Sequence, residues 1–216
     1  MRSLVVSCLL ALGCATSCGD PDDRGVVWTF DNLTSSAGAE VSVLGAPRVR
    51  EGSFIEFDGL DDGLIVETHP LSGATRFTAE VIFRPDEGGA REQRFLHLQE
   101  HGSKNRILFE TRLTGDGRWF LDTYVKSGDK GTTLYARRFP HPIGPWYHAA
   151  LVVDGGEMRH YVDGVLEMSH AIDYRPQRSG RTSIGMRINR VYWFKGAVRR
   201  ARFTPRVLSP EEFLDP

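Results

Sequence analysis

Acidic residues gather in one short stretch of the sequence, FDGLDDG at residues 57–63. Asp58, Asp61 and Asp62 fall within one turn there, and Asp31 with Asn32 follows an earlier apolar run. Calcium prefers oxygen ligands from loops, so Asp31, Asp58, Asp61 and Asp62 are the candidate ligands of a calcium ion. Aspartate and glycine also build tight turns, so the stretch is equally compatible with a turn that binds no ion.

A second group of polar residues combines arginine with aromatic rings near the C-terminus. The stretch RINRVYWF, residues 187–194, contains Arg187, Asn189, Arg190, Tyr192 and Trp193. Guanidinium groups bind carboxylates through paired hydrogen bonds, and aromatic rings line ligand pockets, so this loop is a candidate site for an acidic glycan. Trp119, beside Arg118, is a further candidate for the ligand-binding surface. An arginine-rich hairpin that is simply solvated is the alternative interpretation.

The histidines and the other tryptophans have structural explanations. His97 and His101 are four residues apart, but the residues around His97 have the pattern of a strand, not of a helix that would bring the two together. His148 follows an aromatic pair, and we expect its ring nitrogens to be hydrogen-bonded in or near the core. Trp28 and Trp146 are predicted to fill the core. No histidine metal site is predicted.

Composition limits the functional classes. The chain has 216 residues, of which 40% are hydrophobic and 25% charged, which suits one well-packed β domain. A formal net charge of −1 gives no reason to expect a nucleic-acid partner. Arginine supplies 23 of the 27 basic residues, either through codon usage or because guanidinium groups suit anionic sugars and phosphate.

The N-terminus has the pattern of an export signal. Met1-Arg2 precedes an apolar run, Leu4 to Leu12, that is too short to span a bilayer. The following LGCATSCGD resembles a bacterial lipoprotein signal, with Cys18 as the preferred lipidation site and Cys14 as the alternative; an ordinary secretory signal is a further alternative. The expected organisation is a signal peptide (1–17), a lipidated cysteine with a polar tether (18–25) and one folded domain (26–216).

All three cysteines lie within the first 18 residues. The folded part therefore contains no disulfide, no thiol nucleophile and no cysteine-bound zinc, and core burial must stabilise it.

Beyond the tether, the sequence predicts strands and turns almost throughout. FTAEVIFRP, residues 77–85, alternates Phe77, Ala79, Val81 and Phe83 with polar residues, which is typical of a half-buried antiparallel strand. Ile82 breaks the alternation, which indicates that the polar face is partly covered. Similar runs recur, among them residues 119–125 and 134–139, and Asp-Gly at 163–164 suits a tight hairpin turn. SPEEFL at 209–214 predicts a short C-terminal helix that begins with a capping box. The expected fold is an all-β sandwich of two antiparallel sheets.

Three stretches in the right order carry a family resemblance. WYHAALVVDGGEMRHYVDGVLE (146–167) is similar to the central hairpins of laminin G-like, concanavalin A-like jelly-roll domains. FIEFDGLDDGLIV (54–66) resembles an early strand pair of that family, and SIGMRINRVYWFKGAVRRARFTPRVLSPEEF (183–213) resembles its C-terminal end. The resemblance covers about residues 26–214 and implies a jelly roll of two antiparallel sheets, one concave and one convex.

The resemblance implies binding more readily than catalysis. Family members mostly bind carbohydrate, proteins or cell surfaces, and some bind calcium through loop aspartates. Jelly-roll glycoside hydrolases carry Glu-x-Asp-x-x-Glu on one strand, which this sequence lacks, and YWFKGAV (192–198) has only a passing similarity to one strand of the jelly-roll polysaccharide lyases. We therefore expect a lipid-anchored, non-catalytic module of the bacterial cell envelope that binds extracellular glycan or a surface protein, with membrane contact through its lipid alone. A polysaccharide-degrading enzyme and a structural envelope protein are the alternatives.

Overall fold

Strands form nearly all of the regular structure in the computed structural model of the chain, which describes residues 25–36 and 38–215. The predicted signal peptide, both candidate lipidation sites, Cys14 and Cys18, and most of the tether lie outside the described residues, so these features stay predictions. No helix in the described part of the chain is long and apolar enough to cross a membrane.

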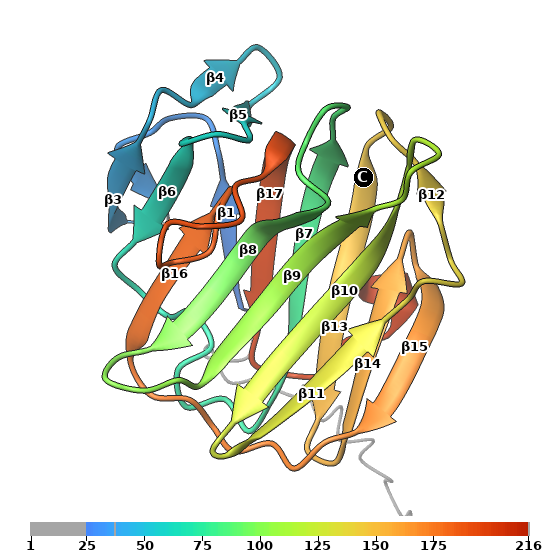
Figure 1. Ribbon diagram of the computed structural model, residues 1–216. Coiled ribbons are helices and arrows are strands. Elements are labelled where there is room, and N and C mark those ends of the chain that lie inside the picture. The colour runs from blue at the N-terminus through green and yellow to red at the C-terminus, as the bar shows by residue number, and fades with distance from the viewer. Residues whose placement is uncertain (1–24, 37, 216) are drawn as a thin grey trace, which may run out of the picture.

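Two antiparallel sheets lie face to face (Figure 1). The back sheet has the order β15 (Val165–Ala171), β14 (Glu157–Val162), β13 (Tyr147–Asp154), β7 (Arg76–Pro85), β17 (Lys195–Thr204), β5 (Phe54–Asp58) and β4 (Arg48–Arg50), and β1 (Val26–Thr29) pairs with β17. The front sheet has the order β11 (Lys130–Tyr135), β10 (Arg118–Ser127), β9 (Arg106–Leu113), β8 (Glu92–Glu100), β16 (Gly180–Ile184), β6 (Gly63–Val66), β3 (Ala39–Leu44) and β2 (Ser35–Ser36), and β12 (His141–Pro142) pairs with β10. The predicted all-β jelly-roll sandwich is confirmed.

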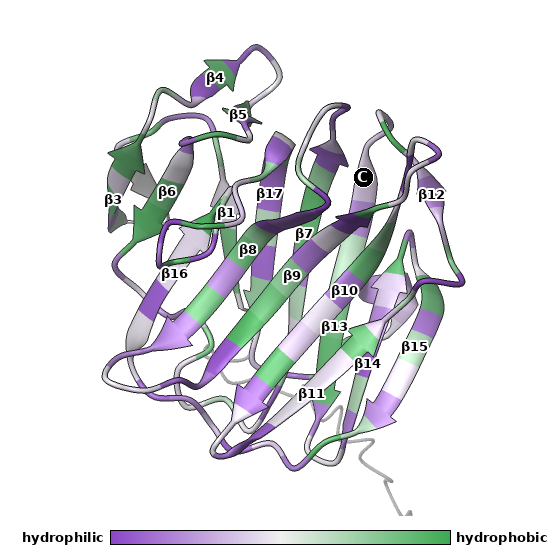
Figure 2. Cartoon of the chain, viewed as in Figure 1, coloured by the Kyte–Doolittle hydropathy of each residue, from purple (hydrophilic) through white to green (hydrophobic). Residues whose placement is uncertain are grey.

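The core lies between the sheets because hydrophobic and hydrophilic residues alternate along the strands (Figure 2). On β7, Phe77, Ala79, Val81 and Phe83 belong to this core, as their spacing predicts. Phe83 stacks on Phe95 of the opposite sheet with ring centroids 4.1 Å apart. Aromatic packing across the sandwich therefore helps to fix the position of one sheet on the other.

The outer face of β7 is also covered, which explains the buried Ile82. The C-terminal segment crosses this face: the backbone N–H of Leu214 donates to Glu80 at 2.8 Å, and Phe213 packs on the ring of His148 at 5.3 Å. His148 in turn contacts the Glu80 carboxylate at 3.0 Å and is buried, as expected for a histidine bonded near the core. The C-terminal segment thus covers part of the outer face of the back sheet, whereas the front sheet carries charged side chains on its outer face.

The predicted C-terminal helix is reduced to one 3₁₀ turn, η2 (Pro210–Glu212). The capping box forms, since the Ser209 N–H donates to the Glu212 carboxylate at 3.0 Å. The helix is this short because Phe213 leaves the turn in an extended conformation, which lets its ring reach Tyr161 at 5.3 Å. Packing on the sheet replaces further helical turns.

One strand lies earlier in the chain than predicted. A strand was expected at 134–139, but β11 ends at Tyr135, and the Phe139 N–H donates to the Ala136 carbonyl at 2.8 Å in a turn. The reason is that the hairpin turn after β10 is tight, so Lys130 already pairs with Ser127.

Candidate functional site

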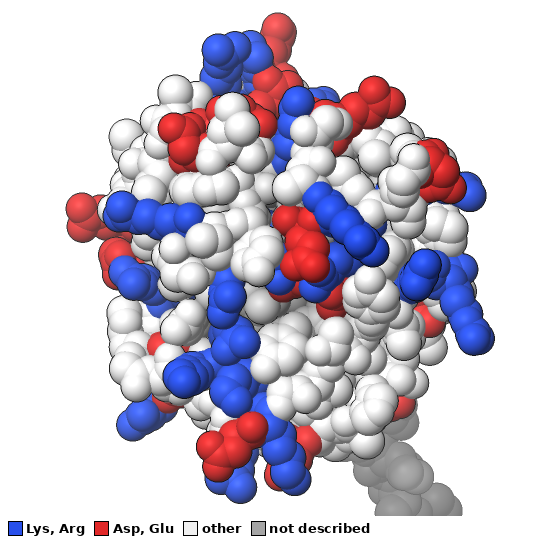
Figure 3. All heavy atoms as spheres, in the orientation of Figure 1, with Lys and Arg blue, Asp and Glu red and all other residues white. Residues whose placement is uncertain are grey.

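The front sheet has a pocket of about 250 Å³ on its outer face, formed by residues that alternate with the core positions of β8 to β11. In one row across these strands, Arg94 lies opposite Glu110, Glu110 opposite Asp122 and Asp122 opposite Tyr135. The residues that line the pocket are Arg94, Arg106, Leu108, Glu110, Arg112, Asp122, Tyr124, Thr133 and Arg187. Figure 3 shows acidic and basic side chains gathered near the middle of this face.

The acids of the pocket are bound by arginines. Glu110 accepts hydrogen bonds from Arg94 Nε at 2.7 Å and from Arg112 Nη2 at 2.9 Å. Arg112 Nη2 also lies 2.8 Å from Asp122 Oδ2, so one guanidinium bridges both carboxyl groups. Glu92 pairs with Arg94 and Arg112 at the rim. Charge-assisted bonds of this kind hold the guanidinium planes in fixed orientations.

Glu110 and Asp122 form a coupled carboxyl pair. Burial, together with the charge of Asp122, raises the pKa of Glu110 to about 7 in spite of the neighbouring Arg94 and Arg112. Burial also raises the pKa of Asp122, although the charge of Arg112 and its hydrogen bond lower it. Two acids in contact in a poorly hydrated place cannot both ionise without cost, so near neutral pH the pair shares a proton.

Arg106 lies at the other end of the pocket and has no carboxylate partner within the described residues. Its guanidinium carbon lies 4.8 Å from the ring centroid of Tyr124, and its Nη1 donates to the Lys104 carbonyl at 2.9 Å. Burial lowers the pKa of Arg106, and its Nε is buried without a hydrogen-bond partner in the described part of the chain. Arg106 therefore keeps a positive charge that no carboxylate of the described residues pairs with.

The predicted arginine and aromatic loop folds against this pocket. Arg187 pairs with Val191 across the loop, with a bond of 3.0 Å from the Arg187 N–H to the Val191 carbonyl. The Ile188 N–H donates to Nδ1 of buried His97 at 2.9 Å, and the Arg94 N–H donates to the Tyr192 carbonyl at 2.9 Å. Two bonds to β8 thus fix the loop, and Arg187 enters the lining of the pocket.

The other loop candidates lie farther from the pocket. Asn189 and Arg190 are exposed at the tip of the loop, and Trp193 is half-buried, but none of the three lines the pocket. Tyr192 is 41% exposed and lies beneath the guanidinium of Arg94. Of the predicted loop residues, Arg187 and Tyr192 are therefore the two that contact the charged pocket.

The prediction that Trp119 belongs to a binding surface was wrong. Its side chain points into the core and is 0% exposed, with ring centroids 5.1 Å from Phe83 and 5.0 Å from Tyr147. Its Nε1 donates to the Pro142 carbonyl at 3.2 Å, which satisfies its polar group inside the fold. The core position of Trp28 is confirmed, whereas Trp146 is only half-buried, with the guanidinium of Arg199 4.2 Å from its ring centroid.

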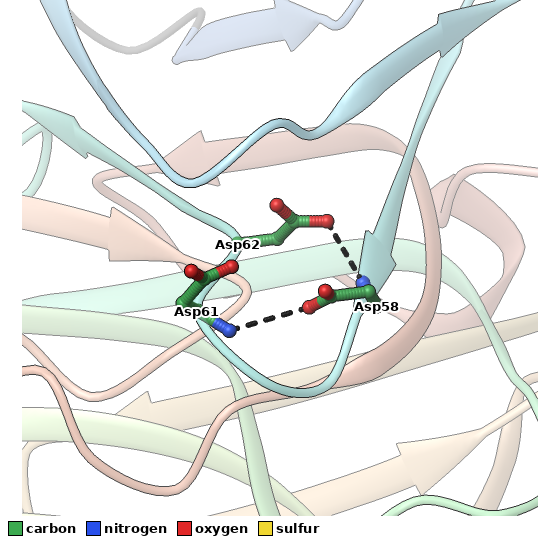
Figure 4. Close-up of side chains that lie close together, drawn as sticks. All are labelled: Asp58, Asp61 and Asp62. Atoms are coloured by element: carbon green, nitrogen blue, oxygen red, sulfur yellow. Dashed lines mark hydrogen bonds between the residues drawn. The ribbon is translucent and has the colours of Figure 1, made fainter.

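Asp58, Asp61 and Asp62 do come together in the turn between β5 and β6 (Figure 4). Each offers a carboxylate oxygen within 4.8 Å of the others. Both oxygens of Asp62 accept backbone N–H groups, from Ala46 at 2.6 Å and from Asp58 at 3.0 Å. Asp62 therefore serves the turn itself, and burial raises its pKa. Asp31 is not part of this group.

Sequence reasoning missed the residues that form the charged row, above all Arg94, Glu110 and Asp122. Their signal was available as period-2 alternation, since Glu110 lies between Phe109 and Thr111, which point inward. The alternation shows the outward face of each strand but not which strands are neighbours. The pocket therefore became visible only with the pairing of β8, β9 and β10.

Comparison with solved structures shows the same fold in other proteins. Domain 4 of AbnA, a GH43 extracellular arabinanase from Geobacillus stearothermophilus in complex with arabinotriose, has a TM-score of 0.64 at 17% identity, covering 87% of this chain and 95% of that one. The receptor binding domain of botulinum neurotoxin D has a TM-score of 0.66 at 13% identity, covering 88% and 51%. The binding domain of botulinum neurotoxin DC in complex with SialylT has a TM-score of 0.65 at 10% identity, covering 88% and 50%. The chain spans about half the length of these two toxin chains.

Among curated proteins, no relative matches the chain. Residues 58–213, well over half of the sequence, match the family described as the concanavalin A-like lectin/glucanases superfamily. This stretch includes all the residues that line the charged pocket, from Arg94 to Arg187, and the turn with Asp58, Asp61 and Asp62. The strand order, the core and the family match agree, and the chain belongs to the concanavalin A-like lectin/glucanases superfamily.

Proposed function

We propose that the protein is a non-catalytic glycan-binding module and that the charged pocket on the front sheet binds an acidic sugar. The observation that carries the proposal is an imbalance of charge: Arg106 and Arg187 have no carboxylate partner within the described residues, whereas Glu110 and Asp122 are ion-paired. A sugar carboxylate would give these two guanidinium groups the anionic partner that they lack in the described residues.

Two similar folds support a glycan as the ligand. The arabinanase domain was solved with arabinotriose and a botulinum neurotoxin binding domain with SialylT. These ligands belong to those proteins, and at 17% and 10% identity the likeness shows the fold alone. The specific support for an acidic ligand is the arginine content of the pocket in this chain.

A glycan array tests the proposal. We would probe the protein with and without calcium, alongside the double variant Arg106→Ala/Arg187→Ala, here called the pocket variant. Arg48→Ala/Arg175→Ala is the matched control, because it removes the same charge from exposed positions away from the pocket. We expect acidic glycans to bind the wild type and the control but not the pocket variant. Binding to no glycan would sink the proposal and direct attention to a surface protein as partner.

A polysaccharide-degrading enzyme is the second candidate, and the Glu110–Asp122 pair is the observation that favours it. A retaining glycosidase needs two carboxyl groups about 5 Å apart with the glycosidic bond between them. Here the guanidinium of Arg112 bridges the two carboxyl groups, so it occupies the space that a sugar linkage would need between them. Release of reducing ends from acidic polysaccharides, abolished in Glu110→Gln, would favour the enzyme over the binding module.

We also propose that the module is exported and anchored to the bacterial envelope by a lipid on Cys18, with Cys14 as the alternative. The support is the apolar N-terminal run followed by small residues and cysteine. Mass spectrometry of the N-terminal peptide from a membrane fraction would locate the lipid. Cys18→Ala should release the protein from membranes, and release by Cys14→Ala instead would move the site.

A further inference from the structure

The charged pocket adjoins a second hollow on the front sheet, and the second adjoins a third at the edge of the sandwich. A hollow of about 480 Å³ shares Arg112 with the pocket and is lined by Arg91, Phe120 and Arg137, among others. A third, of about 660 Å³, shares Tyr135 and Arg137 with the second and is also lined by Arg138, Phe139 and Glu167. Because Glu167 belongs to β15 of the back sheet, this third hollow lies at the edge of the sandwich. Because each hollow shares residues with the next, the three form one track from the loop at Arg187 to the turn after β11.

The track is long relative to one sugar. The outward side chains of β9 from Arg106 to Arg112 alone cover seven residues, or roughly 20 Å at the rise of a strand. Beyond them lies the turn at residues 136–139, where Phe139 is 41% exposed. A single sugar ring would occupy only a fraction of this length, whereas an extended chain could occupy all of it.

Along the track, the carboxylates have basic partners, whereas several arginines have no acidic partner in the described residues. The carboxylates that line it are held by basic side chains: Glu110 and Asp122 by arginine, and Glu167 by Nε2 of His141 at 2.6 Å. The arginines with no carboxylate partner in the described part of the chain lie in two groups, Arg106 and Arg187 at one end and Arg91, Arg137 and Arg138 at the other. Figure 3 shows basic side chains both in the middle of this face and at its right-hand edge.

Aromatic rings lie between the two groups of arginines. The rings of Phe120 and Tyr135 meet edge to face, with centroids 4.7 Å apart, and Tyr135 is 42% exposed. The Arg112 guanidinium lies 5.8 Å from the Tyr135 ring centroid. Rings that pack on one another keep a fixed orientation, so Tyr135 presents a rigid surface between the two cationic ends.

We propose that the ligand is an acidic polysaccharide chain that occupies the whole track, with anionic sugars at both cationic ends and an intervening sugar over Tyr135. This inference rests on the proposed function, because it extends the same pocket into a series of subsites. The shared chemistry is a repeating anionic sugar, whose charge comes from a carboxylate or from a sulfate. Nucleic acid is another repeating polyanion, and the test below separates it from an acidic polysaccharide.

Calorimetry with short and long oligomers tests the inference. The probes are digalacturonate and octagalacturonate for carboxylates, a heparin disaccharide and octasaccharide for sulfates, cello-oligosaccharides as neutral sugars, and a single-stranded DNA octamer. We expect the octamer of one acidic series to bind more than about tenfold tighter than its dimer, because the second cationic end is engaged. Arg137→Ala/Arg138→Ala should remove this advantage, so that the octamer binds no more than a few-fold tighter than the dimer, while the control Arg48→Ala/Arg175→Ala retains it.

The outcomes separate the two proposals. If dimer and octamer bind equally and the pocket variant abolishes both, the track is wrong while acidic-sugar binding stands. Equal octamer affinity in the Arg137→Ala/Arg138→Ala variant would also overturn the track, as would equal affinity for DNA or for neutral oligomers. If the protein binds neither acidic series, the inference is overturned. If it also binds no glycan on the array, the proposed function is overturned as well.

Discussion

Arg94 lies over the ring of Tyr192, with its guanidinium carbon 3.6 Å from the ring centroid. The same guanidinium donates to Glu110 at 2.7 Å, so one arginine joins the loop to the buried acids of the front sheet. Tyr192 has a φ of 60°, in the left-handed region that non-glycine residues rarely adopt. The contact with Arg94 and the backbone bond between the two residues hold the loop in this conformation, and with it the position of Arg187 at the pocket.

Tyr192→Ala should therefore weaken binding of acidic glycan. An exposed cation–π contact contributes about 1 kcal/mol, and losing it releases Arg94 from the loop, so we expect a loss of about fivefold in affinity. Tyr192→Phe keeps the ring and should match the wild type. Calorimetry with the strongest acidic ligand from the array measures both variants. Equal affinities for the alanine and phenylalanine variants would show that the ring does not position the site.

Glu110 should make the protein less stable as pH rises toward neutrality. Because burial raises its pKa from 4.5 to about 7, the folded state retains a proton that the unfolded chain has released. This contribution to the free energy of unfolding is fully present below the ordinary glutamate pKa of 4.5 and is lost as pH rises through about 7.

Glu110→Gln removes this titration, and its amide can donate to Asp122 Oδ1, which lacks a hydrogen-bond partner in the described residues. Urea unfolding at several pH values from about 5 to 8 measures the effect. The advantage of the wild type over the variant should shrink steadily across this range. A difference that stays constant with pH would contradict the raised pKa. Comparing the two proteins cancels the opposite contribution of buried His97 and His160, whose pKa values burial lowers.

Trp119→Phe should reduce stability without affecting the ligand. The smaller ring leaves space among Phe83 and Tyr147 and removes the hydrogen bond to Pro142, at a cost of about 2 kcal/mol. Thermal unfolding measures the loss, and the glycan affinity of the folded variant should equal that of the wild type. Asn189→Ala, at the exposed loop tip, is the control with unchanged stability. Weakened binding by folded Trp119→Phe would return Trp119 to the site.

Calcium binding at the turn between β5 and β6 stays a prediction, and Asp61→Asn tests it. Asp61 is exposed, whereas Asp62 is buried and bonded to the backbone, so removing the Asp61 charge spares the turn. Millimolar calcium should raise the melting temperature of the wild type, because a ligand that binds only the folded state stabilises it. Chelator should reverse the rise, and the variant should not respond. Asp129→Asn, at an exposed turn, is the control, and a wild-type melting temperature indifferent to calcium rules the site out.

Much of the sandwich was predictable because its causes are local. Alternation on β7 places Phe77 and Phe83 in the core whatever the neighbouring strands are, since successive side chains point to opposite faces. The turn at 163–164 returns the chain between β14 and β15, because Asp163 with a φ of 48° and Gly164 with a φ of 77° adopt the conformation that a tight hairpin turn needs. The loop 187–193 was likewise recognisable as a cluster of arginine and aromatic residues.

By itself, then, the sequence determined the strands, the absence of cysteine chemistry from the folded part and the all-β class, since these depend on residue type and short-range spacing. Tertiary structure decided which side chains meet. Arg94, Glu110 and Asp122 belong to three strands whose register comes from the packing of the whole front sheet. Trp119 points inward rather than outward for the same reason, because a shift of one residue exchanges the two faces of a strand. The charged pocket is a property of that register, and only the folded sheets bring its residues together.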